Sequence, residues 1–276
     1  MPTCKTCSHA CQLTEGQLGL CRARRAAGGE VVSESRGRIT SLALDPIEKK
    51  PIARWRPGTT VLSLGSYGCN MRCPFCQNAS IAQVGADDVL WREMSPEEVV
   101  ETALTLSNRA CIGIAYTYNE PLVSWEFLRD TAMLARDAGL VNVLVSNGLA
   151  TEAVLAEIAP LIDAANIDLK CFSDEGYRSL GGDLAATKRT IETLAALPSC
   201  HVEVTTLVVP GLSDDDVQVE EMASWLASLD PAIPYHLTRF FPCHRMSDVP
   251  PTPIATLRRL AEIARRHLPE VILGNV

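Results

Sequence analysis

Short apolar runs alternate with longer amphipathic stretches after residue 60, and no other feature of the chain limits its possible folds as much. The apolar runs predict strands at 61–65, 112–116, 141–145, 165–169, 202–209 and 235–240, with a last strand at 271–273. The stretches between them predict helices at 95–106, 122–138, 151–160, 184–197, 215–229 and 251–267. Strands that alternate with helices form βαβ units and a parallel sheet. The sequence therefore predicts an α/β fold.

The number of these units predicts a partial barrel. Six strand–helix units lie between residue 61 and residue 276, whereas a complete eight-fold barrel usually takes about 250 residues. We therefore expect a partial (βα)6 TIM-type barrel over 61–276. The active site of such a fold lies where the strands end, on the loops that lead into the helices.

Two of the predicted helices begin with capping signals. Ser95 is followed by Pro96 and, three residues on, by Glu98, which is the pattern of a capping box. Ser213 precedes three aspartates, whose charge suits the positive end of a helix, and we expect it to begin the helix at 215–229.

Residues 1–60 predict a small Cys-rich N-terminal appendage to the barrel. They open with four cysteines and sustain no apolar period. Residues 31–44 predict a short hairpin with its turn near Gly37, and 45–60, which contain three prolines, predict an extended connection.

A cysteine triplet follows the first predicted barrel strand. Cys69, Cys73 and Cys76 have the spacing C-x3-C-x2-C on one short loop. Three thiolates can bind three irons of a cubane cluster and leave the fourth iron open, whereas ordinary ferredoxin sites use four cysteines. The alternative is a zinc site, which needs a fourth ligand, and no Cys or His close in sequence supplies one. The spacing therefore favours a [4Fe–4S] cluster with an open iron.

The triplet resembles the signature of radical S-adenosylmethionine (SAM) enzymes. Its wider setting is similar to that of glycyl-radical-enzyme activases such as the pyruvate formate-lyase activase. The phrases CPFCQN, ALDPIEKKP and TRFFP resemble more specifically the radical SAM component of the AmmeMemoRadiSam system. The resemblance implies an enzyme in which SAM binds the open iron and is cleaved reductively to a 5′-deoxyadenosyl radical, which takes a hydrogen atom from a substrate that the resemblance does not identify.

The resemblance also implies cofactor-binding positions near the cluster and at the next two strand ends. Phe75 resembles the family's apolar residue against the adenine, or is a core residue, or both; Asn78 either bonds a cluster sulfur or ends the loop. Tyr118-Asn119-Glu120 stands where the family has a Gly-Gly-Glu-like segment that receives the SAM amino group, so that Glu120 keeps the carboxylate while two glycines are replaced. Ser146 and Asn147 resemble the family's Thr-Asn-Gly segment and can bond the ribose or the SAM carboxylate.

The later strand ends carry further candidates. Asp168-Leu169-Lys170 matches the activase-like Asp-Leu-Lys, so Lys170 can contact SAM or a substrate carboxylate, or simply pair with Asp168 on the same strand face. Glu203 and Thr205 share one strand face that we expect to point into the barrel, because an acid is costly in apolar packing. His236 and Arg239 lie on opposite faces of the sixth strand; together with Lys170 they are our catalytic candidates, with His236 expected inside and Arg239 at the strand end.

The N-terminal cysteines predict a second metal site. Cys4, Cys7, Cys11 and Cys21 supply four thiolates to a segment too small to fold by packing alone. The metal can be zinc or a second iron–sulfur cluster, with His9 as a possible substitute ligand. The alternative is a reduced, disordered tail.

Charge and hydropathy limit the partners. The chain has 33 acidic and 25 basic residues, a net charge of −8, which argues against nucleic-acid binding. It contains no apolar run long enough for a membrane span and no signal-peptide pattern, so we expect a cytoplasmic protein. The expected partners are SAM, an electron donor such as flavodoxin or ferredoxin, and an unknown small-molecule or protein substrate. Two alternatives stay open: a glycyl-radical-enzyme activase that acts on a protein partner, and a non-catalytic iron–sulfur or zinc scaffold.

Overall fold

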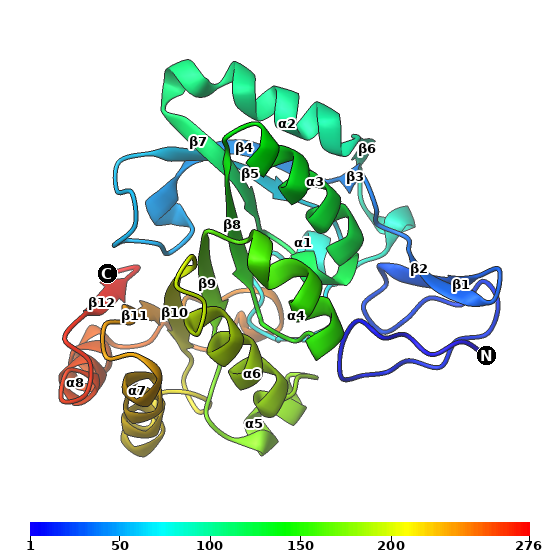
Figure 1. Ribbon diagram of the computed structural model, residues 1–276. Helices are drawn as coiled ribbons and strands as arrows, with labels where there is room; N and C mark the ends of the chain where they lie inside the picture. The colour runs from blue at the N-terminus through cyan, green and yellow to red at the C-terminus, as the bar shows by residue number, and fades with distance from the viewer.

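A computed structural model describes all 276 residues of the protein. Its main sheet has eight strands in the order β12-β11-β10-β9-β8-β7-β5-β4 (Figure 1). All neighbours are parallel except β4 and β5, and the outer strands β12 and β4 do not pair, so the barrel stays open. The strands of this sheet are β4 (Ser41–Pro46), β5 (Thr60–Gly65), β7 (Cys111–Tyr116), β8 (Val141–Ser146), β9 (Ala164–Asp168), β10 (His201–Val208), β11 (Tyr235–Arg239) and β12 (Val271–Gly274). The predicted partial barrel is confirmed.

Helices connect the parallel strands. The six predicted helices are confirmed, with ends within a few residues of those expected, as α2 (Pro96–Thr105), α3 (Trp125–Asp137), α4 (Glu152–Ile158), α6 (Leu184–Ala195), α7 (Asp216–Leu229) and α8 (Ile254–Ala264). Two short helices were not predicted, α1 (Ala79–Ala82) and α5 (Asp174–Ser179). Both are too short to show an apolar period in the sequence.

The two predicted helix starts have different outcomes. Ser95 accepts a hydrogen bond from the Glu98 N–H and the Glu98 side chain accepts one from the Ser95 N–H, so the capping box is confirmed. The prediction for Ser213 is wrong. The N-cap of α7 is Asp215, and the Ser213 hydroxyl instead bonds the Val209 N–H and the Leu207 carbonyl in the preceding turn.

The hairpin predicted at 31–44 is also wrong. β2 (Glu30–Ser33) pairs with the earlier strand β1 (Arg24–Ala27), and the turn lies at Gly28 and Gly29, which both have positive φ. β3 (Arg38–Ile39) pairs with β6 (Arg92–Glu93). β4 leaves the appendage and joins β5 as the antiparallel edge of the main sheet.

The first forty residues are anchored to the barrel by buried contacts. The Arg24 guanidinium is almost fully buried and forms an ion pair with Glu126 of α3 at 2.6 Å. The Thr151 N–H donates to the Thr6 carbonyl at 3.0 Å, and the Thr151 hydroxyl donates to the Lys5 carbonyl at 2.7 Å. The N-terminal segment therefore lies against the loop that follows β8.

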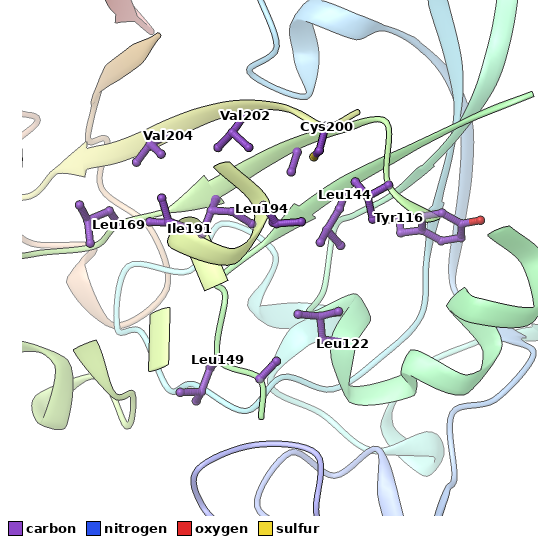
Figure 2. Packing of buried hydrophobic residues seen from close by; sticks show 14 of the residues in the cluster. Tyr116, Leu122, Leu144, Leu149, Leu169, Ile191, Leu194, Cys200, Val202 and Val204 are labelled. Atoms are coloured by element: carbon purple, nitrogen blue, oxygen red, sulfur yellow. The ribbon is translucent and has the colours of Figure 1, made fainter. Parts of the chain in front are cut away.

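The core lies between the sheet and the helices that cover it. Figure 2 shows Ile191 and Leu194 of α6 packed against strand residues such as Val202 and Val204 of β10. None of the helices combines the length and the apolar character that a membrane crossing requires.

Candidate active site

A cavity of about 380 Å³ opens at the carboxyl ends of the strands. Its walls come from the loops after β5, β7, β8 and β9 and from residues on β10 and β11. It brings together most of the predicted site residues: Cys69, Phe75, Cys73, Cys76, Asn78, Tyr118, Asn119, Glu120, Ser146, Asn147, Asp168, Lys170 and Thr205. Positions scattered over more than 130 residues of sequence thus line one cavity.

The three thiols of the β5 loop share this space in an environment that disfavours their charge. Burial raises the pKa of Cys73 to about 11, although the nearby Lys170 ammonium opposes the rise. Burial also raises the pKa of Cys69 and Cys76. Thiolates therefore need a compensating positive centre here, and the donor set suits a cluster of metal ions.

Glu120 joins the ends of β7 and β8. One of its carboxylate oxygens accepts hydrogen bonds from the Leu122 N–H at 3.0 Å and the Ser146 hydroxyl at 2.7 Å, and the other accepts one from the Asn147 N–H at 2.8 Å. Burial raises the pKa of Glu120 to about 7, and these three hydrogen bonds oppose the rise. Because no basic side chain pairs with this buried carboxylate, a cationic ligand group in the cavity would stabilise it.

Asn147 connects the loop after β8 to the cysteine loop. Its side-chain amide donates to the Cys69 sulfur at 3.5 Å and to the Asn70 side-chain oxygen at 2.9 Å. Its own oxygen accepts from the Leu149 N–H at 2.8 Å. The side chain is thus held with its donor toward a predicted cluster ligand.

Asp168 and Lys170 form the ion pair that was the alternative to a ligand-binding role. Their side chains meet at 2.7 Å in the wall of the cavity. Burial alone would lower the pKa of Lys170, but the charges of Asp168 and Cys73 outweigh it and raise the pKa. Lys170 therefore stays a cation in the cavity wall, and the two roles are compatible.

Asn119 and Asn78 hold the loops in place. The Asn119 oxygen accepts from the Ser66 N–H, and its amide donates to the carbonyls of Tyr67 and Gly68 at 3.1 and 3.0 Å. The Asn78 amide donates to the Tyr118 carbonyl at 2.7 Å. Their polar groups are therefore largely engaged by backbone, although both residues line the cavity.

Phe75 and Thr205 differ in the groups that they offer to a ligand in the cavity. Phe75 is buried in the main core and also lines the cavity, so its core role is confirmed and its contact with adenine stays a prediction. The Thr205 hydroxyl is buried, lines the cavity and has no hydrogen-bond partner. An unpaired buried hydroxyl is costly, so it fits a polar ligand at this place.

Three predicted site residues do not reach the cavity. Glu203 lies deeper in the barrel, where its carboxylate accepts from His201 at 2.9 Å, from His236 at 2.5 Å and from the Arg54 N–H at 2.8 Å. His236 does face the interior, as expected, but its ring is engaged by Glu203. Arg239 points to the other side, where it donates to the Thr252 carbonyl. The structure thus gives these residues a place in the barrel interior or at its rim, away from the cavity.

The sequence analysis missed a polar group at the mouth of the cavity. Lys50 is buried, donates to Asp45 at 2.8 Å and lies over the Tyr118 ring, whose hydroxyl also donates to Asp45 at 2.6 Å. The exposed Lys49 lines the cavity beside them. The signal was the phrase ALDPIEKKP, which contains Asp45 and both lysines but was assigned no site residue.

The N-terminal cysteines gather at one place. The Cys4 N–H donates to the Cys11 carbonyl at 2.9 Å and closes a loop, and Cys4, Cys7 and Cys21 are buried. Cys4 and Cys21 are close enough to Cys7 to raise its pKa further, and Cys11 acts in the same way on Cys21. His9 is turned away from this group, because its Nε2 donates to the Asn70 carbonyl at 2.7 Å.

Comparison with known proteins agrees with this arrangement. Residues 64–226 match the protein family described as the radical SAM superfamily. An uncharacterized protein of Methanocaldococcus jannaschii is 38% identical over 99% of this chain and 81% of its own length. Pyruvate formate-lyase 1-activating enzyme of Escherichia coli (strain K12) is 26% identical over 61% of this chain and 71% of its own length. The crystal structure of a domain of pyruvate-formate lyase-activating enzyme from Bacteroides vulgatus has a TM-score of 0.51 at 20% identity and covers 59% of this chain and 99% of that domain.

Proposed function

Because this chain belongs to the radical SAM superfamily, and is therefore an enzyme that uses a [4Fe–4S] cluster and SAM, we propose that Cys69, Cys73 and Cys76 are the ligands of that cluster. The observation that carries the proposal is the single cavity that holds the three thiols together with Glu120 and Thr205. The thiols supply three ligands for four irons, which leaves one iron for SAM. Membership of a superfamily of enzymes leaves no support for the scaffold alternative.

We propose that the neighbouring strand ends bind and orient SAM. Glu120 provides a buried carboxylate for the amino group, and Thr205 provides a free hydroxyl. Asn147 and Phe75 line the same cavity, and Lys170 provides a cation for a carboxylate of SAM or of the substrate. When bound, the cluster supplies the electron that cleaves SAM to the radical that removes a hydrogen atom from the substrate. The chain's own part is to hold these groups in place and to keep water from the cavity.

We also propose a division into residues 1–60, which carry a second metal site at Cys4, Cys7, Cys11 and Cys21, and residues 61–276, which form the radical SAM barrel. The family match, which starts at residue 64, supports the division. The closeness of the four cysteines supports the site. The metal can be zinc or a second iron–sulfur cluster, since cysteine thiolates bind both.

For the electron donor and the substrate we propose only the kind of molecule. The enzyme needs a one-electron donor such as flavodoxin or ferredoxin, and a small-molecule or protein substrate. The similarity to a pyruvate formate-lyase 1-activating enzyme supports a second candidate, an activase that acts on a protein partner. A cytoplasmic location suits both.

The test is cleavage of SAM. The protein is reconstituted anaerobically with iron and sulfide, reduced with dithionite and mixed with SAM, and 5′-deoxyadenosine is measured by chromatography. We expect 5′-deoxyadenosine to form in proportion to the cluster content. An intact [4Fe–4S] signal without any 5′-deoxyadenosine would contradict the proposed function.

A further inference from the structure

We propose that Asn70 is a positioning residue that connects the N-terminal cysteine site to Cys69 and through it sets the reduction potential of the cluster; this proposal rests on the two metal sites proposed above. Asn70 lies between the first cluster ligand and Met71, is almost fully buried, and has no part in the predicted site.

Cys69 lies between two residues that each contact the N-terminal site. On one side is Gly68, with φ of +85°; a Cβ atom there would lie 2.5 Å from the Cys21 carbonyl oxygen and 2.7 Å from the Ala23 Cβ. On the other side is Asn70, whose carbonyl accepts the hydrogen bond from His9. The N-terminal segment therefore packs directly against both neighbours of a cluster ligand.

The Asn70 side chain is fixed on the loop after β8. Its amide donates to the Leu149 carbonyl at 2.8 Å, while its backbone carbonyl accepts the hydrogen bond from His9, two residues after Cys7.

The oxygen of Asn70 carries the connection to the cluster ligand. It accepts the hydrogen bond from the Asn147 amide at 2.9 Å, and this amide also donates to the Cys69 sulfur at 3.5 Å. The sequence of contacts from His9 to Asn70, Asn147 and Cys69 is therefore unbroken. All four residues are buried or half-buried.

The N-terminal segment is fixed to this same region from a second direction. Thr151 donates hydrogen bonds to the carbonyls of Lys5 and Thr6. It lies on the same loop as Asn147 and Leu149. The loop after β8, the cysteine loop and residues 5–9 therefore form one packed unit. A change in the N-terminal site reaches Cys69 without passing through the barrel.

These contacts bear on the reduction potential in a defined direction. Hydrogen bonds to the sulfurs of an iron–sulfur cluster tune its potential, and a donor favours the more negative, reduced state. Asn70 keeps the Asn147 amide directed at the Cys69 sulfur. Without the Asn70 side chain this hydrogen bond weakens, and the potential of the cluster becomes more negative.

The experiment compares reduction potentials of the reconstituted holoenzyme by EPR-monitored titration. In Asn70→Ala we expect the potential to fall by an amount on the order of 59 mV, which is a tenfold change for a one-electron couple. Asn142→Ala is the matched control, because Asn142 is a fully buried asparagine with side-chain bonds to Ala132 and Tyr116, remote from both cysteine groups. We expect its potential to equal that of the wild type.

A double-mutant cycle tests the connection to the second site. Cys4→Ser/Cys11→Ser removes the N-terminal metal, and we expect its effect on the potential to be smaller in the Asn70→Ala background than in the wild type. His9→Ala removes only the hydrogen bond to the Asn70 carbonyl and serves if the double variant does not fold. Equal potentials in Asn70→Ala and wild type, or strictly additive effects in the cycle, would overturn the proposal. Absence of any cluster signal in the wild type would instead refute the proposed function.

Discussion

The side chains in the cavity hold charges that the protein interior disfavours. Burial raises the pKa of Cys73 to about 11 and that of Glu120 to about 7, while Lys170 stays positive because it lies against Asp168. A protein without ligands gains nothing from such an arrangement, since each group costs desolvation energy. The arrangement becomes favourable when a positive metal centre and a cationic ligand group occupy the cavity.

Removal of one thiol tests the ligand assignment. Because three irons need three thiolates, Cys73→Ala should lose the visible absorbance of the cluster and all 5′-deoxyadenosine formation, while the metal of the N-terminal site remains. The matched control is Cys111→Ala, since Cys111 is a buried cysteine on β7 outside the cavity, and this variant should keep its cluster. Metal analysis and the SAM cleavage assay measure both. Full activity of Cys73→Ala would refute the assignment.

How far the sequence reaches can be judged residue by residue. Glu120, Asn147 and Lys170 were predicted at the cavity because their segments resemble those of the family and because the carboxyl ends of parallel strands meet at one edge. The depth of a side chain within the barrel could not be predicted in this way. Strand periodicity places Glu203 and Thr205 on one face, but only the fold shows that Thr205 reaches the cavity and that Glu203 lies beneath it, bonded to His236.

At the scale of elements, local signals decided which predictions succeeded. The capping box at Ser95 involves residues three apart and was confirmed. The hairpin at 31–44 failed because β4 pairs with β5, which begins only after the intervening connection of residues 47–59. Pairing between segments so separated depends on the whole sheet and leaves no local pattern.

The turn into the cysteine loop requires glycine for two reasons, its positive φ and the close packing around it. Gly68→Ala places a Cβ against the Cys21 carbonyl and strains a positive φ, whereas Gly139→Ala strains a positive φ of +76° in open space. We expect Gly139→Ala to lower the free energy of unfolding by about 1 kcal/mol, and Gly68→Ala to lower it by roughly 1–3 kcal/mol more through overpacking. Urea denaturation of both variants measures the difference. Equal losses would contradict the close packing of the N-terminal segment on this loop.

At the scale of the whole molecule, Glu203 holds together three parts of the barrel. It bonds His201 on its own strand, His236 on β11 and the backbone of Arg54 in the connection from the appendage. Burial alone would raise the pKa of Glu203, but these hydrogen bonds outweigh it and lower the pKa to about 2. The carboxylate thus contributes stability above its ordinary pKa of 4.5, and this contribution is lost as the pH falls toward 2.

Glu203→Gln should therefore be less stable than the wild type at neutral pH, by about 2 kcal/mol for the lost charged hydrogen bonds. The difference between the two proteins should shrink as the pH falls from about 4.5 toward 2, because the wild type then loses the same charge. Urea denaturation between pH 3 and pH 7 measures it, with Glu152→Gln, an exposed acid on α4, as the control. A difference that stays constant with pH would show that the charge of Glu203 is not what stabilises the barrel.

The contact between Thr151 and Lys5 spans 146 residues of sequence and has a consequence for the synthesis of the protein. A ribosome adds about 5–20 residues per second, so the N-terminal cysteines leave it roughly 7–29 s before Thr151, which holds their segment on the barrel, exists. During that interval they are accessible to oxidants and to any metal ion in the cell. The nascent chain therefore depends either on early metal loading or on a reducing environment, and slow translation between Lys5 and Thr151 would lengthen its exposure to oxidative damage.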